Sequence, residues 1–160
     1  MSTADAPAPV APALAGPPPR ILIVSAPYYH HVVDGMMSAA QEILGQVKAE
    51  LTVVEVSGAF ELAQAVAIAH KSGRKFDGYV VLGCVVRGET DHYEFICSAT
   101  MDGLMHLAVD QGLCLGTAVL TVDTLAQAVA RSHETGANKG AEAAVACLKQ
   151  IALARKLEAV

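Results

Sequence analysis

The sequence has 160 residues, of which 53% are hydrophobic and 17% are charged, and its net charge is −5. This size and composition suit one globular domain and exclude a disordered chain, and no apolar run approaches the ~18 residues that a membrane span requires. The acidic balance, without basic runs, argues against a nucleic-acid partner, and the apolar surplus predicts burial between the subunits of a homo-oligomer.

All seven prolines lie within the first 27 residues and divide the chain. Residues 1–19 are rich in alanine and proline and contain one charged side chain, Asp5. Because proline removes backbone donors and favours extended structure, they predict a flexible or semi-extended N-terminal tail. The pattern changes at Arg20, so the folded domain is expected to cover residues 20–160.

Strands and helices are expected to alternate along this domain. Short β-branched or apolar runs predict strands at residues 21–26, 51–56, 79–84 and 115–121. Apolar residues at spacings of three and four predict helices at residues 31–46, 60–71, 95–110, 125–132 and 139–157. In the third helix, one apolar side is expected to hold Ile96, Met101, Leu104, Met105 and Ala108. The order predicts an α/β protein, a three-layer αβα sandwich with a four-stranded parallel sheet flanked by helices on both faces.

Ligands bind such sheets beyond the carboxyl ends of the strands. The candidate site segments are therefore residues 27–31, 57–61, 84–92 and 121–124. Most of the aromatic residues fall in or beside these segments, namely Tyr28, Tyr29, Phe60, Tyr93 and Phe95. This clustering predicts a platform for a flat heteroaromatic ligand. The alternative is that some of these rings only cover the edge of the sheet.

The densest polar segment follows the third strand. Its Gly88-Glu89-Thr90 turn precedes a helix and can present free backbone N–H groups to an anion, helped by the helix dipole. His92 lies just beyond the turn, and its imidazole is suited to proton transfer at neutral pH. The alternative is that His92 is a helix cap or a surface residue.

Other charged side chains are weaker candidates. Glu61, one turn into a predicted helix, can accept hydrogen bonds from ligand hydroxyls or only complement the helix N-terminus. Arg131 and Lys139 flank a loop between the last two helices, where solvated charges are usual, although the fork of Arg131 suits a phosphate. The His30-His31 pair has no carboxylate at zinc-type spacing, so no metal is expected.

The four cysteines, Cys84, Cys97, Cys114 and Cys147, form no CxxC pair. They predict neither a disulfide framework nor a zinc site, and a thiol in an apolar stretch usually behaves as a small buried hydrophobe. The first residues lack the basic start and apolar core of a secretory signal. Both observations favour a cytoplasmic protein.

Four motifs in order carry a resemblance to a known family. They are Gly58-Ala59-Phe60-Glu61; Leu82-Gly83 with Val86-Arg87-Gly88-Glu89-Thr90 and His92-Tyr93; Leu120-Thr121 with Gln127-Ala128 and Arg131; and Asn138-Lys139-Gly140. From about Arg20 to Leu157 the sequence resembles the 6,7-dimethyl-8-ribityllumazine synthase family. The resemblance implies a flavodoxin-like fold, active sites between neighbouring subunits of a pentamer, and no metal or organic cofactor. It implies condensation of 5-amino-6-(D-ribitylamino)uracil with 3,4-dihydroxy-2-butanone 4-phosphate to give the lumazine, phosphate and water in riboflavin biosynthesis.

The resemblance also assigns roles to individual residues. His92 matches the proton-transfer histidine. The pyrimidine ring and its ribityl chain would be bound by Tyr28, Ala59, Phe60, Glu61, Cys84, Val85, Val86, Thr117 and Lys139. The phosphate would be bound by Glu89, Thr90 and Arg131. Besides the small-molecule substrates, riboflavin synthase is a candidate partner.

The chain departs from the family pattern at several positions. Ser57 and Ala63 stand where the family usually has proline, Cys84 replaces a common threonine, and Thr117 stands where some members have an aromatic residue that acts in the neighbouring subunit. These departures leave a second hypothesis, a low-activity flavin- or lumazine-binding paralogue that forms shells. A flavodoxin-type electron carrier is a third, although it would normally have a Ser/Thr-rich phosphate loop where residues 26–29 read APYY.

The size of the assembly is left open among a pentamer, a decamer and a 60-subunit shell. The loop at residues 132–138 shows no insertion of the kind that blocks shell closure. In contrast, Pro17-Pro18-Pro19 precede the segment that pairs with a neighbouring sheet in the family, and proline cannot donate to such a ladder.

Overall fold

The computed structural model describes residues 8–133 and 137–158. Within them, the strands β1 (Arg20–Ser25), β2 (Glu50–Glu55), β3 (Gly78–Val86) and β4 (Leu115–Val122) form one parallel sheet in the order β2-β1-β3-β4. This is the strand order of flavodoxin-like folds. The predicted four-stranded parallel sheet is therefore confirmed, with β2 and β4 at its two edges.

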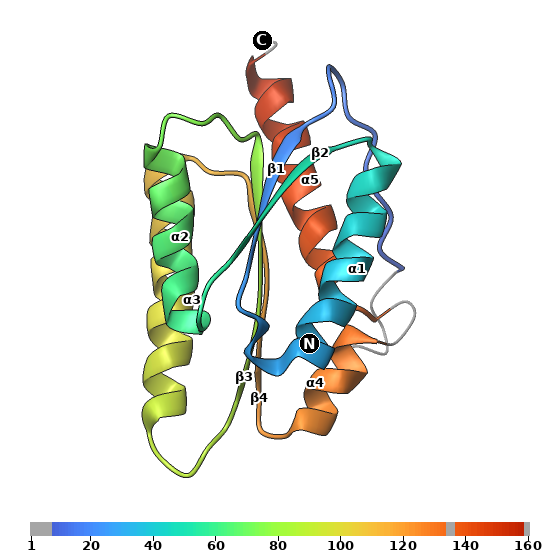
Figure 1. Ribbon diagram of the computed structural model, residues 1–160. Coiled ribbons are helices and arrows are strands. Elements are labelled where there is room, and N and C mark those ends of the chain that lie inside the picture. The colour runs from blue at the N-terminus through green and yellow to red at the C-terminus, as the bar shows by residue number, and fades with distance from the viewer. Residues whose placement is uncertain (1–7, 134–136, 159–160) are drawn as a thin grey trace.

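Helices cover both faces of the sheet and complete the predicted three-layer sandwich (Figure 1). On one face lie α1 (His30–Gln46), α4 (Leu125–Ser132) and α5 (Lys139–Glu158). On the other lie α2 (Ala59–Lys71) and α3 (His92–Gln111). A single 3-10 turn, η1 (Pro27–Tyr29), joins β1 to α1.

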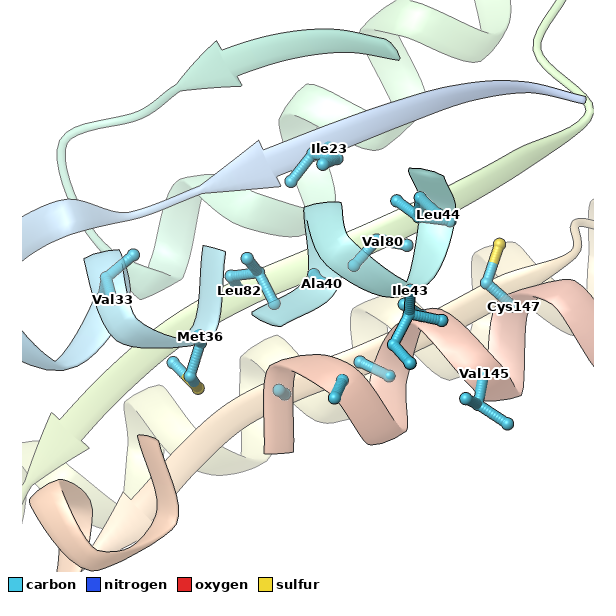
Figure 2. Packing of buried hydrophobic residues seen from close by; sticks show 14 of the residues in the cluster. Ile23, Val33, Met36, Ala40, Ile43, Leu44, Val80, Leu82, Val145 and Cys147 are labelled. Atoms are coloured by element: carbon cyan, nitrogen blue, oxygen red, sulfur yellow. The ribbon is translucent and has the colours of Figure 1, made fainter. Parts of the chain in front are cut away.

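Each face of the sheet has its own hydrophobic core. Successive side chains of β1 point to opposite faces, so Ile21 and Ile23 join one core while Leu22 and Val24 join the other. Burial on both faces explains why this strand is almost continuously β-branched or apolar. Figure 2 shows the first core, in which α1 packs over β1 and β3 and α5 lies alongside.

Helix α5 packs against its neighbours at unusually short range. A Cβ atom at Gly116 in β4 would lie 1.9 Å from the carbonyl oxygen of Ala143 in α5. A Cβ atom at Gly140 in α5 would lie 2.0 Å from the carbonyl oxygen of Met36 in α1. These two glycines therefore allow direct backbone contact, and the alanine-rich composition of α5 serves the same close packing.

Two element boundaries near the candidate site, the end of β3 and the start of α3, differ from the sequence expectation by more than one residue. Strand β3 continues through Val85 and Val86, because Thr121 and Val122 of β4 extend the ladder beside them. Helix α3 begins at His92, three residues before the expected start, because its polar first turn makes contacts that an apolar pattern does not reveal. His92 is thus the first residue of a helix.

Some of the apolar surface remains uncovered in the single chain. Of the residues expected on one side of α3, Leu104 is buried, whereas Met101 and Met105 are 39% and 64% exposed. The edge strand β2 likewise exposes apolar side chains, Val53 among them. These surfaces are available for burial between subunits, as the composition predicts.

The described part of the N-terminal tail lies against the domain. Ala11 and Leu14 pack against the first core, and Arg155 Nη1 of α5 donates to the Ala15 carbonyl oxygen at 2.5 Å. Residues 1–7 of the predicted tail lie outside the described residues, as do residues 134–136 of the loop before α5. None of the helices in the described ranges is long and apolar enough to cross a membrane.

Candidate active site

A cavity of about 710 Å³ lies beyond the carboxyl ends of β1, β2 and β3. Its wall combines η1, the start of α2, the end of β3 and the first turn of α3. Three of the four predicted strand-end segments therefore meet in one place. Many of the predicted site residues line it, namely Tyr28, Ala59, Phe60, Glu61, Cys84, Val85, Val86 and His92.

Exposed aromatic rings stand in the cavity wall. Tyr28 and Phe60 are 74% and 51% exposed, so the chain itself leaves much of both rings uncovered. Tyr29 packs edge-on against Tyr28, with ring centroids 5.1 Å apart. Tyr93 and Phe95 lie outside the wall, so only part of the expected aromatic cluster faces the cavity.

The floor of the cavity near β3 is apolar and uncharged. Burial raises the pKa of the Cys84 thiol to about 11. Burial, followed by the charges of Tyr28 and Cys84, also raises the pKa of Tyr29. Both groups stay protonated at neutral pH, so Cys84 is not a thiolate nucleophile.

The start of α2 presents Glu61 to the cavity. The N-cap, Gly58, provides no side-chain cap, and Glu61 stands in the first turn, where a carboxylate complements the helix dipole. The buried Thr100 of α3 donates its hydroxyl to the Ala59 carbonyl oxygen at 3.1 Å, which ties this turn to α3. The geometry is compatible with both roles predicted for Glu61.

The turn from β3 to α3 connects two residues of the cavity wall, Val86 and His92, although residues 87–91 themselves, the predicted Glu89 and Thr90 among them, do not line the cavity. Glu89 and Thr90 are exposed in this turn, directly before the N-cap residue Asp91 and the first helical residue His92. The first backbone N–H groups of a helix have no intrahelical acceptor, and the helix dipole favours an anion there. The turn can therefore receive a phosphate group beside the imidazole of His92.

The remaining predicted residues lie elsewhere. Thr117, Arg131 and Lys139 line a second hollow of about 250 Å³ on β4, at the open edge of the sheet. Arg131 Nη1 donates to the Gln127 carbonyl oxygen at 2.8 Å, and Lys139 Nζ pairs with Glu142 at 2.7 Å. Thr117 Oγ1 is buried with no hydrogen-bond partner among the described residues. The chain thus carries two separate groups of predicted site residues.

Ile96 is the wall residue that lies outside the candidate segments of the sequence, whereas Tyr29, Ser57 and Gly58 lie within them but were given no individual role. Tyr29, Ser57 and Gly58 adjoin predicted site residues in the chain. Ile96 stands four positions after His92, so both lie on one side of α3. Helical spacing could have identified Ile96, had the earlier start of α3 been known.

The His30-His31 pair takes no part in the cavity. The ring of His31 stacks on His133 with centroids 4.1 Å apart, and His133 Nε2 lies 2.7 Å from the His31 carbonyl oxygen. Within residues 8–133 and 137–158, no three His, Cys, Asp or Glu side chains gather as metal ligands would.

The family model for 6,7-dimethyl-8-ribityllumazine synthase matches residues 18–155. The chain belongs to the 6,7-dimethyl-8-ribityllumazine synthase family. It is 41% identical over 156 residues to the lumazine synthase of Methylorubrum populi, which covers 95% of this chain and 91% of the relative. It is 44% identical over 151 residues to that of Methylobacterium radiotolerans, covering 94% and 90%. Lumazine synthase 1 of Rhizobium meliloti is 40% identical over 146 residues, covering 89% and 95%.

Membership of the lumazine synthase family makes the protein a condensing, transferase-type enzyme of riboflavin biosynthesis with small-molecule substrates. The family resemblance drawn from the sequence motifs is therefore confirmed. The matched residues include all four strands, the cavity wall and the second hollow.

Proposed function

We propose that the protein condenses 5-amino-6-(D-ribitylamino)uracil with 3,4-dihydroxy-2-butanone 4-phosphate to give 6,7-dimethyl-8-ribityllumazine, phosphate and water. One observation supports the proposal most directly. In a chain of the lumazine synthase family, exposed aromatic rings and His92 line one cavity, and His92 begins a helix whose free N–H groups can bind an anion. A flat pyrimidine, a phosphate and a proton-transfer group are what the reaction must bring together.

The pyrimidine substrate would lie against Tyr28 and Phe60. Its ribityl hydroxyls would donate to the Glu61 carboxylate, while backbone groups of residues 84–86 would contact the ring. The neutral, apolar floor at Cys84 supports this placement, because an uncharged heteroaromatic ring loses little on leaving water there.

The phosphorylated substrate would lie at the start of α3. Backbone groups of Glu89 and Thr90 and the helix dipole would hold the phosphate and stabilise it as it leaves. His92 would move protons while the amine and ketone form an imine and the ring closes with loss of water. Loss of phosphate shifts oxidation level only between neighbouring carbons of the substrate, so no external oxidant or reductant is needed, and positioning and proton transfer suffice.

The second hollow supports a site completed by another copy of the chain. Arg131, Lys139 and Thr117 would act in the cavity of a neighbouring subunit, where Arg131 would add a fork suited to phosphate. Each chain would then offer one surface and receive a different one, so the contact would be heterologous, the type of contact that forms a ring when the rotation between subunits closes. A pentameric ring is the assembly we propose.

The tail favours the pentamer over a 60-subunit shell. Arg20 begins β1 directly after three prolines, which cannot donate to a neighbouring sheet, and the preceding residues contact the first core and α5 of their own chain. Sedimentation of the purified protein distinguishes the two sizes.

We further propose a cytoplasmic location, with riboflavin synthase as the enzyme that consumes the product.

The direct test is turnover. Purified protein incubated with both substrates is expected to produce the lumazine, followed by its absorbance and fluorescence. The competing function is a flavin- or lumazine-binding protein, favoured by the orphan hydroxyl of Thr117 where some relatives carry an aromatic residue. Tight binding of riboflavin or lumazine without product formation would support that alternative and contradict the proposal.

A further inference from the structure

We infer that Arg87 is a positioning residue for His92 and the phosphate-binding turn, an inference that rests on the proposed function. Arg87 lies just after β3, outside the cavity wall formed by the described residues. Its backbone N–H donates to the Val122 carbonyl oxygen at 2.9 Å, so its main chain is fixed to β4. The side chain therefore extends from a rigid point on the sheet.

The guanidinium of Arg87 links the first turn of α3 to the segment that follows β4. Nη1 donates to the Glu94 carboxylate, and Nε donates to Asp123 Oδ1 at 2.8 Å. The guanidinium carbon also lies 4.2 Å from the centroid of the Tyr93 ring. Tyr93 and Glu94 directly follow His92 in α3, whereas Asp123 follows β4.

These contacts join the two ends of the turn between β3 and α3. Residues 88–91 run from the backbone of Arg87 to the first turn of α3, and the Arg87 side chain bridges the same two points. The N-cap residue Asp91 makes no side-chain cap hydrogen bond, whereas Thr124 and Gln127 form a full capping box at α4. Arg87 therefore supplies to the start of α3 the restraint that capping supplies to α4.

The network matters more than its separate ion pairs. The side chains of Arg87, Glu94 and Asp123 are 44%, 55% and 65% exposed, and a single exposed pair contributes little to stability. However, one planar guanidinium that holds two carboxylates and a ring has little freedom to move. The hydrogen bond from Arg87 also lowers the pKa of Glu94, so this carboxylate keeps its charge to a lower pH than an isolated glutamate does. The expected consequence is an effect on the geometry of the turn rather than on folding.

Kinetics of Arg87→Gln give the first test. The variant is expected to lower kcat by roughly ten- to a hundredfold, because small displacements of a catalytic group are costly. The KM for the pyrimidine substrate should stay within about twofold of the wild-type value. The kcat of Arg87→Lys should lie between those of Arg87→Gln and the wild type. The matched control is Arg74→Gln. Arg74 also stacks on an aromatic ring, Phe76, but it lies in the loop after α2, away from the cavity wall. The kcat and KM of this variant should equal those of the wild type.

Two results would overturn the positioning role. One is a kcat for Arg87→Gln within twofold of wild type. The other is that the effects of Arg87→Gln and His92→Ala on kcat are additive. If Arg87 acts by positioning His92 and its turn, Arg87→Gln should lower kcat much less in the His92→Ala protein than in the wild type.

Amide hydrogen exchange tests the same restraint without activity. In intact protein, peptides covering residues 92–100 should exchange faster in Arg87→Gln than in wild type, with no such change in Arg74→Gln. Unchanged exchange would contradict the inference. This readout separates the two proposals, because it detects loosening of α3 even if the protein forms no lumazine.

Discussion

Replacement of His92 by alanine is expected to lower kcat by roughly 10²–10⁴-fold, the usual contribution of a positioned general acid or base. His92 is the histidine that lines the cavity, and it stands next to the turn where the phosphate would lie. Its side chain is exposed, so its loss removes little packing. Steady-state kinetics with both substrates, beside thermal unfolding of the same samples, measure the two effects.

The matched control for this variant is His106→Ala. His106 is an exposed residue of the same helix α3, one that does not line the cavity. It should retain wild-type kcat and melting temperature. A His92→Ala enzyme that is folded and turns over at the wild-type rate would remove His92 from the proposed catalytic role.

Replacement of Gly140 by alanine is expected to lower the free energy of unfolding by about 3 kcal/mol or more, at or above the upper end for overpacked sites. The new Cβ would lie 2.0 Å from the carbonyl oxygen and 2.6 Å from the carbonyl carbon of Met36. Both are backbone atoms within a helix, so relief requires α5 to move away from α1. Urea or thermal unfolding of the purified variant measures the loss.

Gly45→Ala controls for the substitution itself. Gly45 lies in the last turn of α1, and a Cβ atom there meets nothing within 4 Å. Alanine also has the higher helix propensity, so this variant should be as stable as wild type or more stable by up to about 1 kcal/mol. Equal stability of Gly140→Ala and Gly45→Ala would show that α1 and α5 are not in backbone contact.

Local patterns were sufficient for the order of elements and for most of the cavity. Parallel strands place their carboxyl ends along one edge, so residues after β1, β2 and β3 could be expected to meet. The pattern could not show that β4 lies at the edge of the sheet, because alternation of elements does not fix strand order. The separation of Arg131 and Lys139 from His92 depends on that order.

The element boundaries near the site depend on contacts distant in sequence. Val86 belongs to β3 because Val122 pairs with it, and the polar first turn of α3 is held by Arg87. Hydrophobic periodicity contains no information on such polar contacts. The same limit explains why Ile96 was missed as a wall residue, and why the apolar side predicted for α3 did not distinguish the buried Leu104 from the exposed Met101 and Met105.

We propose that each active site combines the cavity of one chain with the β4 hollow of another. Co-expression of a His92→Ala chain with an Arg131→Ala chain tests it most directly, because each mixed ring can hold sites with both groups intact. Random mixing leaves His92 in half of the cavities and Arg131 in half of the neighbours, so about one quarter of wild-type activity should return. If both residues act within one chain, the mixed assembly will be no more active than the two single variants, and the shared site is contradicted.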